Sequence, residues 1–170
     1  MVLVFRIQEP REEVIMSIEK AFGNEKVWHL KLHTPLCVEE GTTLRDTIRQ
    51  MQERNTGCVN ILRKKRVVGV FTERDILRKV IMARFPLDEP ISKHMTEEPV
   101  VASKDASVGE IISIMEQNEV RHVPLVDNRR EFVGIVSIRN IIDFLAEHYP
   151  AEVLNLPPQL HQKIHNVDGG

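Results

Sequence analysis

Apolar residues follow two different spacings along this chain, and the two spacings predict alternating helices and strands. Spacings of three and four residues, typical of one helix face, run through 44–51, 76–81, 108–115 and 141–145. Short runs rich in β-branched residues, typical of strands, occupy 58–62, 67–71, 122–126 and 132–136. Charged segments at 63–66 and 127–131 join these runs in pairs, and they are short enough for hairpins.

The same succession of elements occurs twice, because the chain resembles itself when it is shifted by 64 residues. Pro35 then falls on Pro99, and Val59 falls on Val123. One extra residue near Glu131 changes the shift to 65 for the rest of the second copy. Each copy has about 60 residues, and units of this size rarely bury enough apolar surface alone. We therefore expect the two copies to share one core.

Each copy begins with a short extended segment, at 36–38 and 100–102, and continues as helix, strand, strand and helix. The first helix of each copy is preceded by a capping-box spacing, formed by Thr43 with Asp46 and by Ser107 with Glu110. Hairpins in place of long crossover connections favour an α+β fold, in which helices cover one face of each sheet.

Two flanking regions lie outside the repeat. The N-terminal region predicts a strand at 2–7 and a helix from Arg11 to about Gly23 with one apolar stripe. This helix either packs on the repeats or forms a docking face for a partner chain. The tail from Pro150 has the composition of a loose extension. The chain thus divides into an N-terminal extension, two repeats and a tail, at 1–26, 27–86, 87–149 and 150–170.

Composition and charge are those of an ordinary soluble globular protein, with 42% hydrophobic and 28% charged residues. The formal net charge of −2 gives no general attraction to nucleic acid or to an anionic membrane. No apolar run approaches the length of about 18 residues that a membrane span needs. Two cysteines are too few for a disulfide framework, and no signal-peptide pattern is present. We therefore expect a cytoplasmic protein with reduced thiols.

The sequence offers no convincing catalytic or metal-binding constellation. It has no glycine-rich phosphate loop of known spacing, and no nucleophile comes with a base and an orienting group. His161 and His165 have a spacing that suits a metal on a helix, but they lie in the proline-containing tail, so we expect no metal site. The basic run at 63–66 is better interpreted as the tip of a hairpin than as a nucleic-acid contact.

The two copies are similar to a known family. The chain resembles a CBS domain in the stretch PVVASKDASVGEIISIMEQNEVRHVPLVDNRREFVGIVSIRNII, and again in PLCVEEGTTLRDTIRQMQERNTGCVNILRKKRVVGVFTERDIL. Two CBS domains in tandem resemble a Bateman module, and the resemblance covers about residues 27–148. It implies two β-α-β-β-α units packed by their sheets about a pseudo-twofold axis. It also implies a cleft between them that binds AMP, ADP, ATP or S-adenosylmethionine.

The segment 69–75 resembles the ligand motif of this family in full. Thr72 lies where a strand gives way to a helix, which is a natural N-cap position, and the free N–H groups there suit a phosphate. Asp75, one turn further, can accept both ribose hydroxyls through its two carboxylate oxygens. On spacing alone the commoner interpretation is structural, with Thr72 only a cap and Asp75 an acid favoured by the helix dipole.

The second copy departs from the family at one position. Ser137 keeps the cap hydroxyl, but Asn140 replaces the acid and brings one acceptor oxygen without charge. Charge-assisted hydrogen bonds are roughly twice as strong as neutral ones. We therefore expect the cleft that uses Thr72 and Asp75 to bind an adenosine nucleotide more tightly.

The resemblance also assigns residues to the phosphates and to the base. The basic side chains that would reach the phosphates are Arg74, Arg121, His122 and Arg139. The walls of the base pocket would come from Leu36, Cys37, Val38, Val100, Val101 and Ala102. Pro124 cannot donate to a strand ladder, so it predicts a strand edge or the rim of the cleft. Each of these residues also has a purely structural interpretation, as a solvated charge or as strand core.

The favoured function is a stand-alone regulatory module that binds an adenosine-containing nucleotide and signals to a partner protein. The alternative is a ligand-free dimerisation scaffold, and a small enzyme ranks last because no catalytic constellation is present. No cofactor is expected to be required. Apolar residues on more than one face of the outer helices, at 76–81 and 141–145, predict a homodimer.

Overall fold

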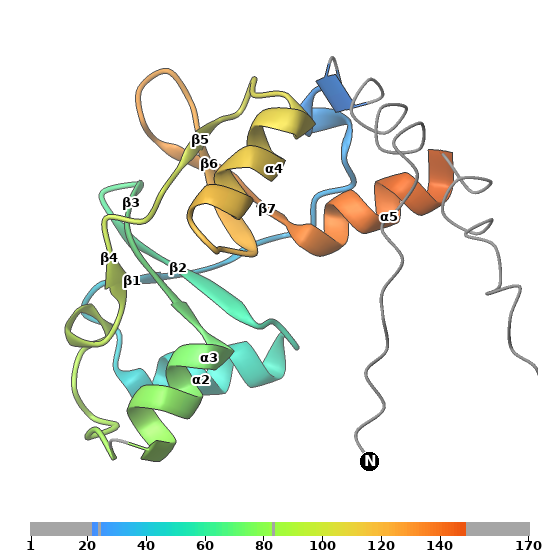
Figure 1. Cartoon of the computed structure of the whole chain (residues 1–170). Helices are drawn as coiled ribbons and strands as arrows, with labels where there is room; N and C mark the ends of the chain where they lie inside the picture. Colours follow the sequence, from blue (N-terminus) through green and yellow to red (C-terminus); the bar gives the residue numbers. More distant parts are fainter. Residues whose placement is uncertain (1–21, 24, 83, 149–170) are drawn as a thin grey trace, which may run out of the picture.

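The computed structural model describes residues 22–23, 25–82 and 84–148. The predicted strand at 2–7, most of the helix from Arg11, and the tail with His161 and His165 lie outside the described residues. Two small sheets with flanking helices make up the described part, and they confirm the predicted α+β fold class (Figure 1).

The first lobe contains the first repeat and one strand from the connection to the second repeat. Its elements are β1 (Leu36–Glu39), α2 (Leu44–Glu53), β2 (Cys58–Arg63), β3 (Arg66–Thr72), α3 (Glu73–Asp75), η2 (Ile76–Met82), η3 (Ile91–Lys93) and β4 (Thr96–Glu97). The sheet order is β1-β2-β3-β4, in which β1 and β2 are parallel and the other pairs are antiparallel.

The second lobe repeats this plan with a smaller sheet. Its elements are β5 (Ala102–Ser103), α4 (Val108–Gln117), β6 (His122–Val126), β7 (Phe132–Ser137) and α5 (Ile138–His148), together with the short helix η1 (Val27–His29) from the N-terminal side. The sheet order is β5-β6-β7, with β5 parallel and β7 antiparallel to β6. No helix within the described residues is both long enough and apolar enough to cross a membrane.

Local sequence signals are confirmed at the helix starts and the first hairpin. The Asp46 backbone N–H donates to Thr43 Oγ1 at 3.1 Å, and Ser107 and Glu110 exchange the two hydrogen bonds of a capping box. Lys64 and Lys65 both adopt left-handed backbone angles, with φ of 48° and 66°. These angles match the twist of the flanking strands, so the basic run is the hairpin turn that its spacing predicts.

The outer helix of the first lobe differs from the predicted α-helix over 76–81. The segment η2 winds as a π-helix, and the Phe85 backbone N–H closes its end on the Lys79 carbonyl at 3.3 Å. Lys79 lies within this wider turn and makes two polar contacts there. Its ammonium forms an ion pair with Asp75, one turn earlier, and donates a hydrogen bond to the backbone carbonyl of His94. Its counterpart α5 is a regular α-helix, as predicted.

The expectation of one shared core is wrong, because the buried apolar residues form two separate clusters. The first is built from β1, β2, β3 and α2, and it is completed by Ile91 from the connection between the repeats. The second is built from the second repeat, and it is completed by Val27, Leu30 and Phe22 from the N-terminal side. Each small repeat therefore gains apolar surface from a segment outside its own helices and strands.

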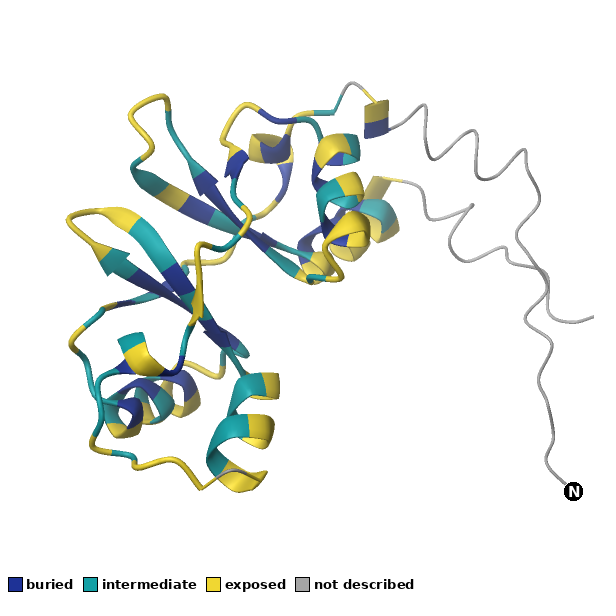
Figure 2. Cartoon of the chain, turned by 60° about the vertical axis from the view of Figure 1, so that its left-hand side comes forward, coloured by how far each residue is buried: buried dark blue, intermediate teal, exposed yellow. Residues whose placement is uncertain are grey.

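The two lobes face each other through their sheets. The helices α2 and α3 lie on the side of the first sheet away from the second lobe (Figure 1), and the strands of both lobes point their hairpin ends to the same side (Figure 2). The lobes touch at the hairpins, where the Phe132 N–H donates to the Lys65 carbonyl at 2.8 Å. Lys65 Nζ also lies 3.9 Å from a Glu131 carboxylate oxygen.

Pro124 lies within the central strand β6 and is buried, so its predicted place at a strand edge or cleft rim is wrong. The neighbouring strand accommodates it. β5 pairs only with Leu125 and Val126, whereas the longer β1 pairs along the equivalent strand from Val59 to Leu62. Because a proline has no N–H to donate, the parallel ladder in the second lobe begins just beyond Pro124.

Candidate ligand-binding cleft

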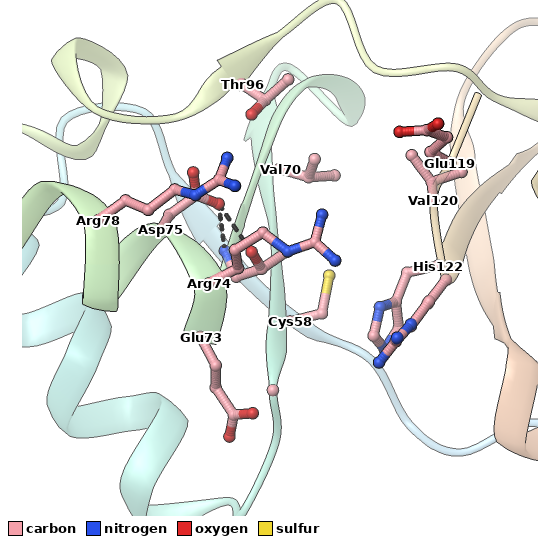
Figure 3. Close-up of a pocket in the computed structure, with 13 residues that line it drawn as sticks. Cys58, Val70, Glu73, Arg74, Asp75, Arg78, Thr96, Glu119, Val120 and His122 are labelled. Carbon is pink, nitrogen blue, oxygen red and sulfur yellow. Dashed lines mark hydrogen bonds between the residues drawn. The ribbon is translucent and has the colours of Figure 1, made fainter. Parts of the chain in front are cut away.

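A cavity of about 350 Å³, here called the main cleft, lies between the two lobes (Figure 3). From the first lobe it is lined mainly by Gly57, Cys58, Val70, Thr72, Arg74, Asp75 and Arg78. From the connection and the second lobe it is lined by Thr96, Glu119, Val120, Arg121 and His122. Its volume falls within the usual range for small-molecule sites.

The carboxylate of Asp75 is held in place by the residue that ends β3. Thr72 has an extended backbone and precedes the helix, and both its backbone N–H and its hydroxyl donate to Asp75 Oδ2, at 2.9 and 2.8 Å. The other carboxylate oxygen, Oδ1, lies 3.0 Å from Lys79 Nζ. Three of the roughly four acceptor positions of this carboxylate are therefore used, and one on Oδ1 remains for a ligand.

Three guanidinium groups line the main cleft without an ion-pair partner among the described residues: Arg74, Arg78 and Arg121. In Figure 3 the Arg74 side chain extends across the cleft toward the second lobe. By contrast, Arg63 on the hairpin is paired with Glu40. Glu73 and Glu119 also line the cleft, so the arginines face some negative charge. Guanidinium forks suit phosphate oxygens, and this set favours an anionic ligand.

Cys58 and His122 are equivalent residues of the two repeats, and both border the main cleft and a second, smaller cavity. Burial lowers the pKa of His122, the nearby Glu73 carboxylate partly opposes this effect, and Arg121 adds to it. Burial raises the pKa of Cys58 to about 12, and the negative charge of Asp75 contributes. Cys58 is therefore a protonated thiol and a poor nucleophile.

The smaller cavity belongs to the second copy of the motif and holds only about 90 Å³. Asn140 Oδ1 accepts from the Ser137 backbone N–H at 2.8 Å and from the Ser137 hydroxyl at 2.7 Å, which reproduces the geometry at Asp75. Asn140 Nδ2, however, donates to the Lys31 backbone carbonyl at 2.7 Å. Lys31 Nζ is paired with Glu147 on α5, and Leu32 packs on the second core. The chain before β1 therefore narrows the second cleft.

The structure brings five of the predicted site residues together in the main cleft: Thr72, Arg74, Asp75, Arg121 and His122. Leu36, Ser137 and Asn140 border the smaller cavity instead, while Val101 and Ala102 border a shallow depression beside the start of α4. The remaining predicted residues border none of these three cavities: Cys37, Val38, Val100, Pro124 and Arg139. The predicted walls of the base pocket are thus not assembled around Asp75.

Several lining residues were missed by sequence reasoning. Arg78 follows Arg74 by four positions, so helical spacing alone could have placed both on one face. Thr96 and Glu119 come from loops and strand ends that carry no comparable signal. Among the described residues, no group of three or more His, Cys, Asp or Glu side chains could hold a metal ion.

Comparison with family models matches the CBS domain twice, at residues 29–81 and 91–147. A CBS domain-containing protein of Arabidopsis thaliana is 34% identical over 130 residues, which are 75% of this chain and 23% of that protein. An uncharacterised 17.7 kDa protein of Acidianus ambivalens is 32% identical over 105 residues, which are 61% of this chain and 63% of that protein. This chain therefore spans less than two thirds of the length of these relatives.

Solved structures of similar chains include two with adenosine compounds. A CBS domain protein of Pyrobaculum aerophilum in complex with AMP has a TM-score of 0.64 and 28% identity, and the alignment covers 72% of this chain and 98% of that one. A CBS domain pair in complex with 5′-methylthioadenosine and S-adenosylmethionine has a TM-score of 0.59 and 22% identity, over 65% of this chain and 91% of that one. The second likeness shows a shared fold only.

Proposed function

The chain belongs to the CBS domain family, and on this premise we propose that it is a regulatory module that binds an adenosine phosphate in the main cleft. The proposal rests mainly on one observation: the main cleft holds both an oriented carboxylate, Asp75, and three guanidinium groups. These guanidinium groups have no ion-pair partner among the described residues. A carboxylate of this kind accepts ribose hydroxyls, and the arginines bind phosphate oxygens.

Charge favours a nucleotide phosphate over S-adenosylmethionine. The sulfonium group of S-adenosylmethionine is positive, so Arg74, Arg78 and Arg121 in the same cleft would repel it. The phosphates of AMP, ADP or ATP would instead neutralise these side chains. His122 reinforces this preference, because a bound phosphate stabilises its protonated form.

We propose further that one nucleotide binds per chain. The smaller cavity of about 90 Å³ lies below the usual size of a ligand site, and the side-chain amide of Asn140 is committed to Ser137 and Lys31. The main cleft is therefore the binding site, and the second cleft has a structural role.

The main cleft takes residues from both lobes, so a bound ligand would change the angle between the lobes or make them more ordered. The regulated partner would sense this change. We propose that the module acts as a homodimer in the cytoplasm. Leu77, Ile81 and Met82 on η2 are 57%, 62% and 78% exposed, and they form an apolar face that a second copy would cover. The competing function is a dimeric scaffold whose clefts bind no ligand.

A thermal-unfolding screen with AMP, ADP, ATP and S-adenosylmethionine tests the proposal. A ligand at 100 times its dissociation constant stabilises the folded state by about 2.7 kcal/mol, which raises the melting temperature. We expect the three phosphates to raise it and S-adenosylmethionine to raise it least. No shift with any of the four compounds would favour the ligand-free scaffold, and conversion of the nucleotide to product would favour an enzyme.

A further inference from the structure

Lys79 links the ribose-binding carboxylate to the connection between the repeats. Its ammonium lies 3.0 Å from Asp75 Oδ1 and also donates to the backbone carbonyl of His94. The side chains of Lys79 and Asp75 are 28% and 16% exposed, so both partners are partly shielded from water. His94 is buried and immediately precedes Met95 and the cleft residue Thr96.

The number of acceptor positions on Asp75 makes Lys79 a competitor of the ribose. Thr72 fills Oδ2 with two hydrogen bonds, and Lys79 uses one of the two positions on Oδ1. One ribose hydroxyl can share Oδ1 with the ammonium. A second hydroxyl needs the position that Lys79 holds, so a complete cis-diol displaces the ammonium from the carboxylate.

We propose that Lys79 is a positioning residue that sets the affinity for the ribose diol and reports its binding to the connection at 91–97; the inference rests on the proposed function. With the diol bound, the ammonium would retain only a carbonyl partner, and a partly buried charge without its counter-ion is unfavourable. Lys79 then turns to solvent and releases the His94 carbonyl. The connection, which carries η3 and β4, loses one of its ties to η2.

Lys79 lies on a helix that is also exposed at the protein surface, so its release can affect that surface. Lys79 lies on η2, the π-helical segment whose side chains Leu77, Ile81 and Met82 form the exposed apolar face. π-Helical turns are frequent at functional sites. A change of partner at Lys79 therefore acts on the helix that the proposed dimer uses and on the strand β4 that lines the cleft.

The test compares AMP with 2′-deoxy-AMP, which lacks one hydroxyl of the diol, by calorimetry. In Lys79→Met the competitor is gone, so the preference for AMP over 2′-deoxy-AMP should rise about two- to fivefold, the amount set by one partly exposed ion pair. Lys93→Met is the matched control, because Lys93 is paired with Glu89 on the same connection and does not touch Asp75. The preference of Lys93→Met for AMP over 2′-deoxy-AMP should equal that of the wild type.

A ratio that is unchanged or lower in Lys79→Met would overturn the inference, and this result would be obtained if the Thr72 hydroxyl turned away from Asp75 instead. A second measurement needs no variant. Hydrogen exchange at residues 94–97 should be faster in the wild-type AMP complex than in the 2′-deoxy-AMP complex, and equal rates contradict release of the connection. If neither nucleotide binds the wild type, the proposed function fails before the role of Lys79 is reached.

Discussion

Asp75 and Asn140 occupy equivalent positions in the two repeats, but they face different partners. Each is held by the hydroxyl residue three positions earlier, at nearly the same distances. Asp75 presents its second oxygen to Lys79 and the main cleft, whereas Asn140 is 3% exposed and uses its amide nitrogen to bind the Lys31 carbonyl. A carboxylate cannot donate this last hydrogen bond, so the exchange of an oxygen for an amide nitrogen separates a carboxylate that faces the main cleft from a buried structural contact.

We expect His122 to make the stability of the folded chain depend on pH. Its pKa is lowered in the folded chain, mainly by burial, so the unfolded chain takes up a proton first as the pH falls. Neutral His122 therefore makes its full contribution to the free energy of unfolding above pH 6.5, the ordinary histidine pKa. This contribution is lost as the pH falls from 6.5 toward the lowered pKa of the folded chain.

Urea unfolding at pH 7.5, 6.5 and 5.5 checks this effect in the wild type and in His122→Gln. The stability difference between the two proteins should shift in favour of the variant as the pH falls. His33→Gln is the control, because His33 is exposed, and it should follow the wild type at each pH. A difference between wild type and His122→Gln that stays constant over this range would contradict the assignment.

At the scale of elements, the two hairpins are equivalent in sequence but not in packing. Gly69 on β3 and Gly134 on β7 are equivalent residues, and both are buried. Only β3 has a further strand, β4, on its outer side, because the connection brings Met95 and Thr96 against the first sheet. Gly69 is therefore needed for close approach of the connection, whereas a Cβ at Gly134 would make only ordinary van der Waals contacts, with Leu32 and Leu125.

Substitution by alanine should change the free energy of unfolding more at Gly69 than at Gly134. A Cβ on Gly69 would lie 3.1 Å from Met95 Cβ and closer still to the sulfur, whereas the nearest atom to a Cβ on Gly134 is Leu32 Cδ1 at 3.8 Å. We expect Gly69→Ala to lower the free energy of unfolding by about 1–3 kcal/mol, as overpacking does. We expect Gly134→Ala to change it by less than about 0.5 kcal/mol. Equal effects in denaturant unfolding would show that Met95 does not constrain β3.

Signals that lie within a few residues of one another were readable from the sequence. The Thr43 and Ser107 caps, the turn at Lys64 and Lys65, and the placement of Thr72 before Asp75 are all of this kind. Contacts between distant segments were not readable. Lys31 reaches Asn140 across 109 positions, and nothing in the composition of the segment before β1 indicates that it enters the second cleft.

The same limit applies to the two cores and to the base pocket. Ile91 completes the first core and Val27 the second, so the packing crosses the boundaries that the repeat defines. Val38 and Ala102 belong to these cores and do not border the main cleft. Periodicity identifies buried positions, but it does not indicate which of two cores a flanking segment joins.

At the scale of the whole molecule, η2 presents an apolar face that no other described segment covers. Leu77, Ile81 and Met82 are all more than half exposed, and Ile142 on α5 is 53% exposed. A homodimer that covers these residues would place the helix that carries Lys79 at the interface, next to the nucleotide.

Light scattering at micromolar concentration tests this assembly. The wild type should have twice the mass of the chain, and Ile81→Asp should have the mass of one chain, because a charge in an apolar interface is unfavourable. Val100→Asp is the control, since Val100 is 40% exposed outside η2 and α5. A wild-type protein of 19.6 kDa would rule out the dimer.

Calorimetric titration of the wild-type chain with AMP tests whether the main cleft binds the nucleotide, with Asp75→Asn and Asn140→Ala as the paired variants. We expect one AMP per chain in the wild type and in Asn140→Ala. We expect Asp75→Asn to weaken AMP binding by about one to two orders of magnitude, which is the loss expected when a charge-assisted hydrogen bond becomes neutral. Full affinity in Asp75→Asn, or two bound nucleotides per wild-type chain, would contradict the assignment of the main cleft.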